Sequence, residues 1–397
     1  MKTNPARLRQ QLEELAALGR TPSGICRLAY SDAFWKSNEY IADLMRQAGM
    51  TVRTNPVGNV VGTYPGRSPW RITVGSHIDS VVNGGMFDGC LGVIAGIEAV
   101  RTLHEAGFTP EHTIDVAAFA EEEGLTVAGL LGSRAYCGLD PTPVMRERMG
   151  RFGVTEADFA AAKAESPIDC SLELHIEQGG VLESRRINIG VVTAIVAIKR
   201  YEIEFTGTAN HAGTTPMALR DDALLKAARF IQQVPQAVAE TDPEMVGTVG
   251  RLEVSPNAVN TIPGTVKLIL ELRAVSDSSV ETAYQRLIDG AEGVTSSRLV
   301  FHDPCYRMDE ALRQAIHTAC GELNLSATDM PSGAGHDSMS LAQVTRPAMI
   351  FVPSVRGVSH SPNEDTLWTD VENGANVLLH TLCIADKLPQ DGERSSG

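Results

Sequence analysis

Apolar residues recur along the chain with helical and strand periods in alternation. A helical stripe over residues 5–18 and a second helical pattern over about 32–49, ending at Gly49, come first. Short β-branched runs at 70–74 and 113–120 then flank a helical pattern over 91–102. A period-two run at 172–176, a helix over 309–323, a core strand at 349–352 and a last helix ending near residue 388 follow. This alternation predicts an α/β fold, with a mixed, mostly parallel sheet and helices on both faces.

The pattern changes near residue 190. Long β-branched strands are expected over 191–206, 247–254 and 265–272, with helices over about 221–238 and 277–290. This order predicts an inserted α+β domain with an antiparallel sheet at 195–308, so that segments 1–194 and 309–397 form one domain around it. The polar tail at 390–397 is expected to fray.

The composition of the chain limits the binding partners to be expected and indicates its cellular compartment. The 397 residues are 43% hydrophobic, enough for two domains and a large core. The formal charge of −15 disfavours nucleic acids and anionic membranes, which require clustered Lys and Arg. Seven scattered cysteines without CxxC spacing indicate reduced thiols. With no signal-like start and no apolar run near the ~18 residues that span a bilayer, we expect a cytoplasmic protein.

A glycine-rich stretch behind the strand at 70–74 is the first candidate for metal chemistry. His77 and Asp79 lie two residues apart at the strand end, on one face, where a carboxylate beside a ligand histidine fixes the orientation of the ring. Asp88 lies between glycines just before the helical pattern at 91–102, where the helix dipole favours an anion. Taken alone, this stretch fits an ordinary strand-turn-helix equally well.

Matching residues recur at other strand ends. Glu121–Glu123 follow the apolar strand at 113–120, His175 lies in the strand at 172–176, and His360 follows the strand at 349–352. A single histidine or a run of acids is more often a plain surface or core feature. Five nitrogen and oxygen donors from separate strand ends instead indicate a dinuclear site for divalent cations, with one glutamate to bind metal and another to accept a proton from water.

Several segments, in order along nearly the whole chain, resemble the hydantoinase/carbamoylase amidohydrolases. These form the allantoate amidohydrolase, N-carbamoyl-L-amino acid hydrolase and β-ureidopropionase branch of the dinuclear, zinc-exopeptidase-like metallopeptidase fold. The segments are Gly-Ser-His-Ile-Asp-Ser (75–80), Gly-Gly-Met-Phe-Asp-Gly (84–89), Glu-Glu-Gly (122–124), Leu-Gly-Ser-Arg-Ala (131–135), Leu-Glu-Leu-His-Ile-Glu-Gln-Gly (172–179), His-Ala-Gly-Thr-Thr-Pro-Met (211–217), Asn-Ala-Val-Asn-Thr-Ile-Pro-Gly (257–264), Ser-Gly-Ala-Gly-His-Asp (332–337) and Ser-His-Ser-Pro-Asn-Glu (359–364).

The resemblance implies a division of roles among the donors. One metal would be held by His77, Asp88 and His175, and the other by Asp88, Glu123 and His360, with Asp88 bridging the two. Glu122 would be the general base, and Asp79 would orient His77. Two divalent ions per subunit are expected, manganese or zinc, with cobalt and nickel as alternatives that the same ligands suit.

The resemblance also implies a substrate site shared with the insert, which would form a homodimer and act as a lid. His211 would polarise the scissile carbonyl, and Asn260 and Arg273 would hold the carboxylate of a small-molecule substrate, some of them across subunits. Gln178 and the loop that contains Gly333 and Ala334 would complete the pocket. Read without the resemblance, Arg273 is equally a surface arginine on a strand.

Three positions depart from the family pattern. Glu271-Leu-Arg273 replaces Asp-x-Arg, Gly124-Leu-Thr-Val-Ala replaces Gly-x-Arg-Phe, and His336-Asp-Ser replaces His-Asp-Ala. The first touches the carboxylate clamp and the second follows the base, so they bear on the substrate more than on the reaction.

The expected activity is hydrolysis of a linear C–N bond in an N-carbamoyl or ureido acid, such as an N-carbamoyl-L-amino acid or allantoate. An aminoacylase or dipeptidase on the same scaffold is the nearest alternative, and a metal-dependent binding protein without catalysis is another. Glu122 beside the ligands argues against the latter, and the absence of a plausible Gly-x-Ser-x-Gly elbow argues against a serine hydrolase.

Overall fold

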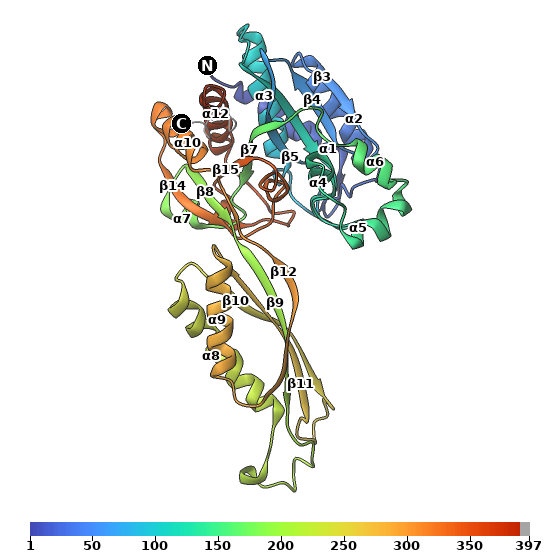
Figure 1. Ribbon diagram of the computed structural model, residues 1–397, viewed down its shortest axis with the longest axis vertical. Coiled ribbons are helices and arrows are strands. Elements are labelled where there is room, and N and C mark those ends of the chain that lie inside the picture. The colour runs from blue at the N-terminus through green and yellow to red at the C-terminus, as the bar shows by residue number, and fades with distance from the viewer. Residues whose placement is uncertain (390–397) are drawn as a thin grey trace. The chain divides into compact units, whose positions relative to one another are not determined.

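The computed structural model describes residues 1–389 and divides into two compact units (Figure 1). One unit comprises Met1–Thr193 and the segment from Arg307 onward, and the other is the insert Ala194–Tyr306. The tail for which fraying was predicted lies outside the described residues. Among the residues described, no helix combines the length and apolar character needed to cross a membrane.

The first unit is built on a nine-stranded mixed sheet in the order β13-β8-β15-β7-β5-β6-β4-β3, with β14 paired to β8. The four central strands, β15, β7, β5 and β6, run parallel to one another, so their carboxyl ends meet at one edge. The bounds are β3 (Thr51–Thr54), β4 (Val60–Tyr64), β5 (Ser68–His77), β6 (His112–Phe119), β7 (Ile168–Ile176), β8 (Ile189–Ile195), β13 (Tyr306–Arg307), β14 (Ala327–Ser332) and β15 (Arg346–Val352).

Helices cover both faces of this sheet. The larger core lies under α1 (Pro5–Leu18), α2 (Asp32–Gln47), α3 (Cys90–Glu105), α10 (Glu310–Leu323) and α12 (Trp368–Ala385). The opposite face is covered by α4 (Leu131–Cys137) and α11 (Ser338–Leu341), with α5 (Pro143–Arg148) and α6 (Glu156–Ala161) beyond them and α7 (Val181–Arg185) after β7. Along β6, Val116 and Ala118 pack in the larger core, while Ala117 and Phe119 pack against α4, as the period of a strand buried on both faces requires.

The helix boundaries follow local capping chemistry. Asn4 accepts hydrogen bonds from the amides of Ala6 and Arg7, and Pro5 occupies the first turn of α1, where its missing N–H costs nothing. Ser31 caps α2 in the same manner, and Gly49 follows this helix with a φ of 84°. These helices coincide with the two that the sequence predicts, to within two residues.

The second unit is a four-stranded antiparallel sheet in the order β10-β11-β9-β12, with two helices packed on one face (Figure 1). Alternate residues of β11, Val266, Leu268, Leu270 and Leu272, are buried in the core with α8 and α9. Its bounds are β9 (Ala197–Thr206), α8 (Ala223–Thr241), β10 (Val246–Ser255), β11 (Thr265–Ala274), α9 (Asp277–Asp289) and β12 (Val294–Asp303).

The predicted fold class is confirmed, but not every strand was expected. The longest strand that was not expected is β12, at the edge of the second sheet, and β14 in the first sheet was not expected either. Most residues of β12 are exposed, so their sequence lacks the alternation of apolar and polar residues that marks a half-buried strand.

Candidate metal centre

The parallel strands deliver donors to a single edge of the first sheet. His77 is the last residue of β5, and His175 is the penultimate residue of β7. Glu121–Glu123 follow β6 after one intervening residue. Asp88 stands two residues before α3, and His360 lies on the loop that leaves β15. The structure therefore gathers the five donors that the sequence placed at separate strand ends.

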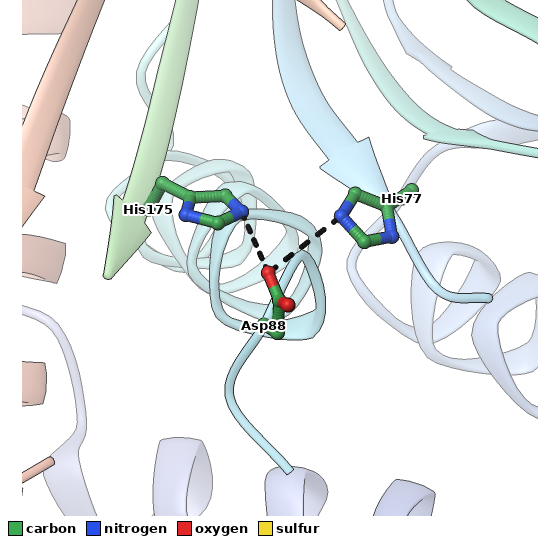
Figure 2. A group of neighbouring side chains, drawn as sticks. All are labelled: His77, Asp88 and His175. Carbon is green, nitrogen blue, oxygen red and sulfur yellow. Dashed lines mark ion pairs between the residues drawn. The ribbon is translucent and has the colours of Figure 1, made fainter. Parts of the chain in front are cut away.

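Asp88 is the residue common to two clusters of donors. Its Oδ1 lies 3.1 Å from Nε2 of His175 and 3.9 Å from Nε2 of His77, and all three side chains are buried. Dashed lines in Figure 2 mark these two contacts. Its Oδ2 lies 3.1 Å from Nε2 of His360, which is 3.6 Å from Oε2 of Glu123. Within each cluster the donor atoms lie within 4.8 Å of one another, and one carboxylate faces both, as a bridging ligand requires.

Main-chain contacts fix the tautomer of both buried histidines. Nδ1 of His77 lies 3.0 Å from the carbonyl of Asp79, and Nδ1 of His175 lies 2.9 Å from the carbonyl of Ile176. The Nδ1–H groups therefore donate to these carbonyls, and the Nε2 atoms face Asp88. The amide of Gly89 also approaches Nε2 of His175, at 3.2 Å.

The Asp79 carboxylate contacts different groups from those the sequence suggests. It accepts hydrogen bonds from the amides of Glu122 (3.2 Å) and Glu123 (3.1 Å), while it stays 3.8 Å from Nδ1 of His77. The ring of His77 is instead oriented by the main-chain carbonyl of Asp79. Asp79 thus anchors the turn that carries both glutamates.

Gly89 allows the start of α3 to approach the ring of His77. Its φ is 65°, and a Cβ at this position would lie 2.5 Å from ring atoms of His77. Any other residue would push Asp88 or His77 out of the cluster, so glycine is required for the approach.

The cluster concentrates negative charge in a small cavity. Burial, followed by repulsion from Asp337 and Glu123, raises the pKa of Glu122 well above its ordinary value. Burial and the charge of Asp88 raise the pKa of Glu123 to about 8, and its Oε1 is buried without a hydrogen-bond partner among the described residues. Among the described residues that line the cavity there is no lysine or arginine, and carboxylates and histidines crowded in this way fit a pair of divalent cations.

The cavity has a volume of about 150 Å³ and includes part of the predicted pocket. Gln178 lines it and donates from Nε2 toward both oxygens of Asp88, at 3.3 Å each. From the loop after β14, Ala334 and Gly335 line the cavity, whereas Gly333 is not among its lining residues.

The second unit contains the remaining predicted residues, in two places. His211 and Asn260 lie together, because Ala212 donates to the carbonyl of Asn260 at 2.9 Å and His211 bridges to Thr261. Nδ1 of His211 accepts hydrogen bonds from the amides of Gly213 (3.0 Å) and Thr214 (3.3 Å). The proton of the neutral ring therefore lies on Nε2, which is available to donate to an oxyanion.

Arg273 lies at the other end of the same sheet. The loops with His211 and Asn260 adjoin Thr206 and Thr265, which pair at one end of β9 and β11, whereas Arg273 is eight residues along β11 from Thr265. At a rise of about 3.3 Å per residue, this separation is roughly 25 Å. Nε of Arg273 donates to Glu271 at 2.8 Å, so the glutamate that departs from the family pattern orients the guanidinium.

Four buried residues near the centre were given no role from the sequence. The His336 ring makes an edge contact with His175, with centroids 4.5 Å apart, and Glu173 accepts hydrogen bonds from Ser76 and Ser338 behind the same histidine. Both carboxylate oxygens of Asp337 are buried, and Glu364 accepts the amides of Phe87 and Asp88. All four lie in the segments at 172–179, 332–337 and 359–364 on which the resemblance rests, so their positions, though not their roles, could be read from the sequence.

Comparison with known proteins identifies the family. The model of Peptidase family M20/M25/M40 matches residues 73–383. The chain belongs to this family. It is 36% identical to the N-carbamoyl-L-amino-acid amidohydrolase of Paenarthrobacter aurescens over 97% of this chain and 99% of the relative, and 35% identical to the ureidoglycolate hydrolase of Arabidopsis thaliana over 94% and 85%.

A solved structure narrows the branch of the M20 family. The hydantoinase/carbamoylase family amidase of Burkholderia multivorans superimposes with a TM-score of 0.88 at 35% identity, covering 98% of this chain and 99% of that one. The chain is therefore an amidohydrolase of the hydantoinase/carbamoylase branch and acts on C–N bonds other than peptide bonds. M20 membership implies a dinuclear metal site, and the buried clusters that share Asp88 fit such a site.

Proposed function

We propose that this protein hydrolyses the linear C–N bond of an N-carbamoyl or ureido acid, with two divalent cations held in the cavity at the strand ends. The observation that carries the proposal is the bridging arrangement of Asp88 between the His77–His175 pair and the Glu123–His360 pair, beside Glu122. When bound, the cations supply Lewis-acid chemistry and a more acidic water molecule. Manganese and zinc are the first candidates, because histidine, aspartate and glutamate suit both.

Glu122 is the group suited to move the proton. Its Oε2 lies 3.8 Å from Nε2 of His77 at the wall of the cavity, and its side chain is only 11% exposed. Its carboxylate lines the cavity beside the donors that would hold the cations, so Glu122 takes the proton of the attacking water and returns it to the leaving nitrogen. Asp79 holds the turn that carries Glu122 and Glu123, because its carboxylate accepts hydrogen bonds from the backbone amides of both residues.

His211 is suited to stabilise charge on the substrate oxygen. Two backbone amides donate to its Nδ1, so Nε2 is the ring nitrogen that can donate a hydrogen bond. A donor directed at a developing oxyanion typically increases the reaction rate by about 10²–10³. Asn260 stands on the adjoining loop and offers an amide for the carboxylate of the substrate.

The separation of Arg273 from His211 and Asn260 supports a homodimer. One small acid cannot contact residues roughly 25 Å apart on a single sheet, so Arg273 and the His211–Asn260 pair would serve a given substrate from different subunits. Arg273 then grips the carboxylate with two parallel hydrogen bonds. We assign dimerisation and lid closure to the insert, 195–308.

The substrate class follows from the relatives named above. One acts on N-carbamoyl-L-amino acids and another on ureidoglycolate, and all of these molecules carry a carbamoyl nitrogen and a carboxylate. N-carbamoyl-L-amino acids, allantoate and ureidoglycolate are therefore the candidates.

A cytoplasmic location agrees with seven cysteines that are all free thiols.

Release of ammonia from the carbamoyl and ureido substrates, and of free amino acid from the N-acetyl and dipeptide substrates, tests the proposal across a substrate panel. The enzyme is stripped with a chelator, reloaded with Mn²⁺ or Zn²⁺, and assayed with N-carbamoyl-L-amino acids, allantoate, ureidoglycolate, N-acetyl amino acids and dipeptides. We expect metal-dependent release of ammonia from at least one of the first three. Cleavage confined to N-acetyl amino acids or dipeptides would instead identify an aminoacylase or dipeptidase.

A further inference from the structure

Glu364 connects two ligand-bearing loops that are far apart in the sequence. Its Oε1 accepts hydrogen bonds from the amides of Phe87 (3.0 Å) and Asp88 (3.1 Å), and its Oε2 accepts one from the hydroxyl of Ser359 (3.0 Å). Its carboxylate is therefore bonded to the bridging residue Asp88 on one side and to the neighbour of His360 on the other. With 7% of its surface exposed, this contact is shielded from water, where charge-assisted hydrogen bonds are strong.

His360 depends on its loop more than the other histidines do. The rings of His77 and His175 are anchored at Nδ1 by main-chain carbonyls, at the ends of central strands. The side chain of His360 is 51% exposed, its backbone has a φ of 52°, and within the described residues its polar contacts are with Asp88 and Glu123. The position of its ring is therefore set by whatever holds residues 359–364.

Gly85 shows that the chain makes room for this contact. A Cβ at Gly85 would collide with the carboxylate and with Cβ of Glu364. Since the backbone of Gly85 does not need glycine for its φ, the need for glycine comes from the approach of Glu364. The contact can therefore be disturbed from either side.

We propose that Glu364 is a positioning residue that holds Asp88 and His360 in register for the cation bound by Asp88, Glu123 and His360. This inference rests on the proposed function for the presence of two cations. It predicts an unequal defect that is larger at this cation, because the other cation shares Asp88 but keeps His77 and His175 on their own anchors when Glu364 is removed.

Asp386 offers a matched control at the opposite end of the sheet. It is buried like Glu364 and also accepts hydrogen bonds from two consecutive amides, those of Glu111 (2.9 Å) and His112 (2.7 Å), at the start of β6. Asp386→Ala therefore removes an equivalent carboxylate far along the strands from the ligands. A merely structural role for Glu364 would make the two alanine variants behave alike.

The test titrates Co²⁺ into the metal-free, full-length wild type, Glu364→Ala and Asp386→Ala, by calorimetry and by the visible spectrum of bound cobalt. We expect two cations in the wild type, and in Glu364→Ala a loss of about 10–100-fold in affinity for one of them, as is typical for partners of metal ligands. Asp386→Ala should keep both affinities. Unchanged affinities in folded Glu364→Ala, equal weakening of both cations, or the same loss in Asp386→Ala would each overturn the inference.

Two further variants cover a failure of Glu364→Ala to fold. Glu364→Gln keeps an acceptor for the amides of Phe87 and Asp88 but loses the charge and the acceptor for Ser359, so a smaller, still unequal loss is expected. Gly85→Ala should reproduce the defect with Glu364 intact. Wild-type cobalt binding in both would overturn the inference, whereas a wild type that binds no cation pair and releases no ammonia would count against the proposed function instead.

Discussion

The two units differ in how complete their share of the site is. In the first unit, parallel strand ends bring His77, Asp88 and His175 together in one buried cluster, with Glu123 and His360 beside it, all from a single chain. In the second unit, the residues expected to bind substrate lie at opposite ends of an antiparallel sheet. Parallel strands direct their carboxyl ends to one edge, whereas antiparallel strands distribute loops to both ends. The metal-binding half is thus assembled within one chain, whereas the substrate-binding half would be completed by the proposed homodimer.

Removing the base should have the largest effect. Glu122→Gln keeps the shape of the side chain but cannot accept a proton, so kcat should fall by about 10²–10⁴. Cation content, measured by elemental analysis, should remain that of the wild type, since Glu123 and Asp88 are intact. Near-wild-type ammonia release from the metal-loaded variant would contradict the role of Glu122.

Replacement of His211 should have the second-largest effect on activity, and it tests whether the second unit acts across subunits. His211→Ala is expected to lower kcat by about 10²–10³ through loss of one oxyanion donor. In heterodimers of His211→Ala with Glu122→Gln, one site would regain both an intact base and the partner's histidine. Recovery of up to half of the wild-type activity is expected, while purified heterodimers as inactive as the parents would show that His211 serves its own chain.

Arg273→Lys should give a smaller effect that appears in KM. Lysine keeps the positive charge but cannot make two parallel hydrogen bonds to a carboxylate, and it loses the orientation that Glu271 gives through Nε. We expect kcat/KM to fall by about 10–100-fold, mostly through KM, which corresponds to about 1–3 kcal/mol. Arg298→Lys on the exposed edge strand is the matched control, and equal losses in both variants would remove Arg273 from the site.

The sequence predicts the central strands that carry the donors better than the strands at the sheet edges, for a physical reason. β5, β6 and β7 are buried on both faces, so packing constrains their residues, and the donors follow at their ends. The edge strand β12 has mostly exposed residues and no apolar alternation to reveal it. The contacts of Asp79 and Glu364 depend on backbone amides brought together by the fold, which side-chain patterns do not report.

The smallest effect is expected at the end of the sheet remote from the cations. The hydrogen bond to Asp386, with Asp169 facing the other ring nitrogen, raises the pKa of His112 above 6.5, although burial opposes this. A raised folded-state pKa means that this stabilisation is complete below about pH 6.5 and is lost as the pH rises through the folded value. Asp386→Ala should lower the free energy of unfolding by about 1–3 kcal/mol, because two buried amides lose their acceptor. Urea unfolding at several pH values should show the gap to wild type narrowing above pH 6.5, with kcat unchanged, and a gap that widens there would contradict the pairing of His112 with Asp386.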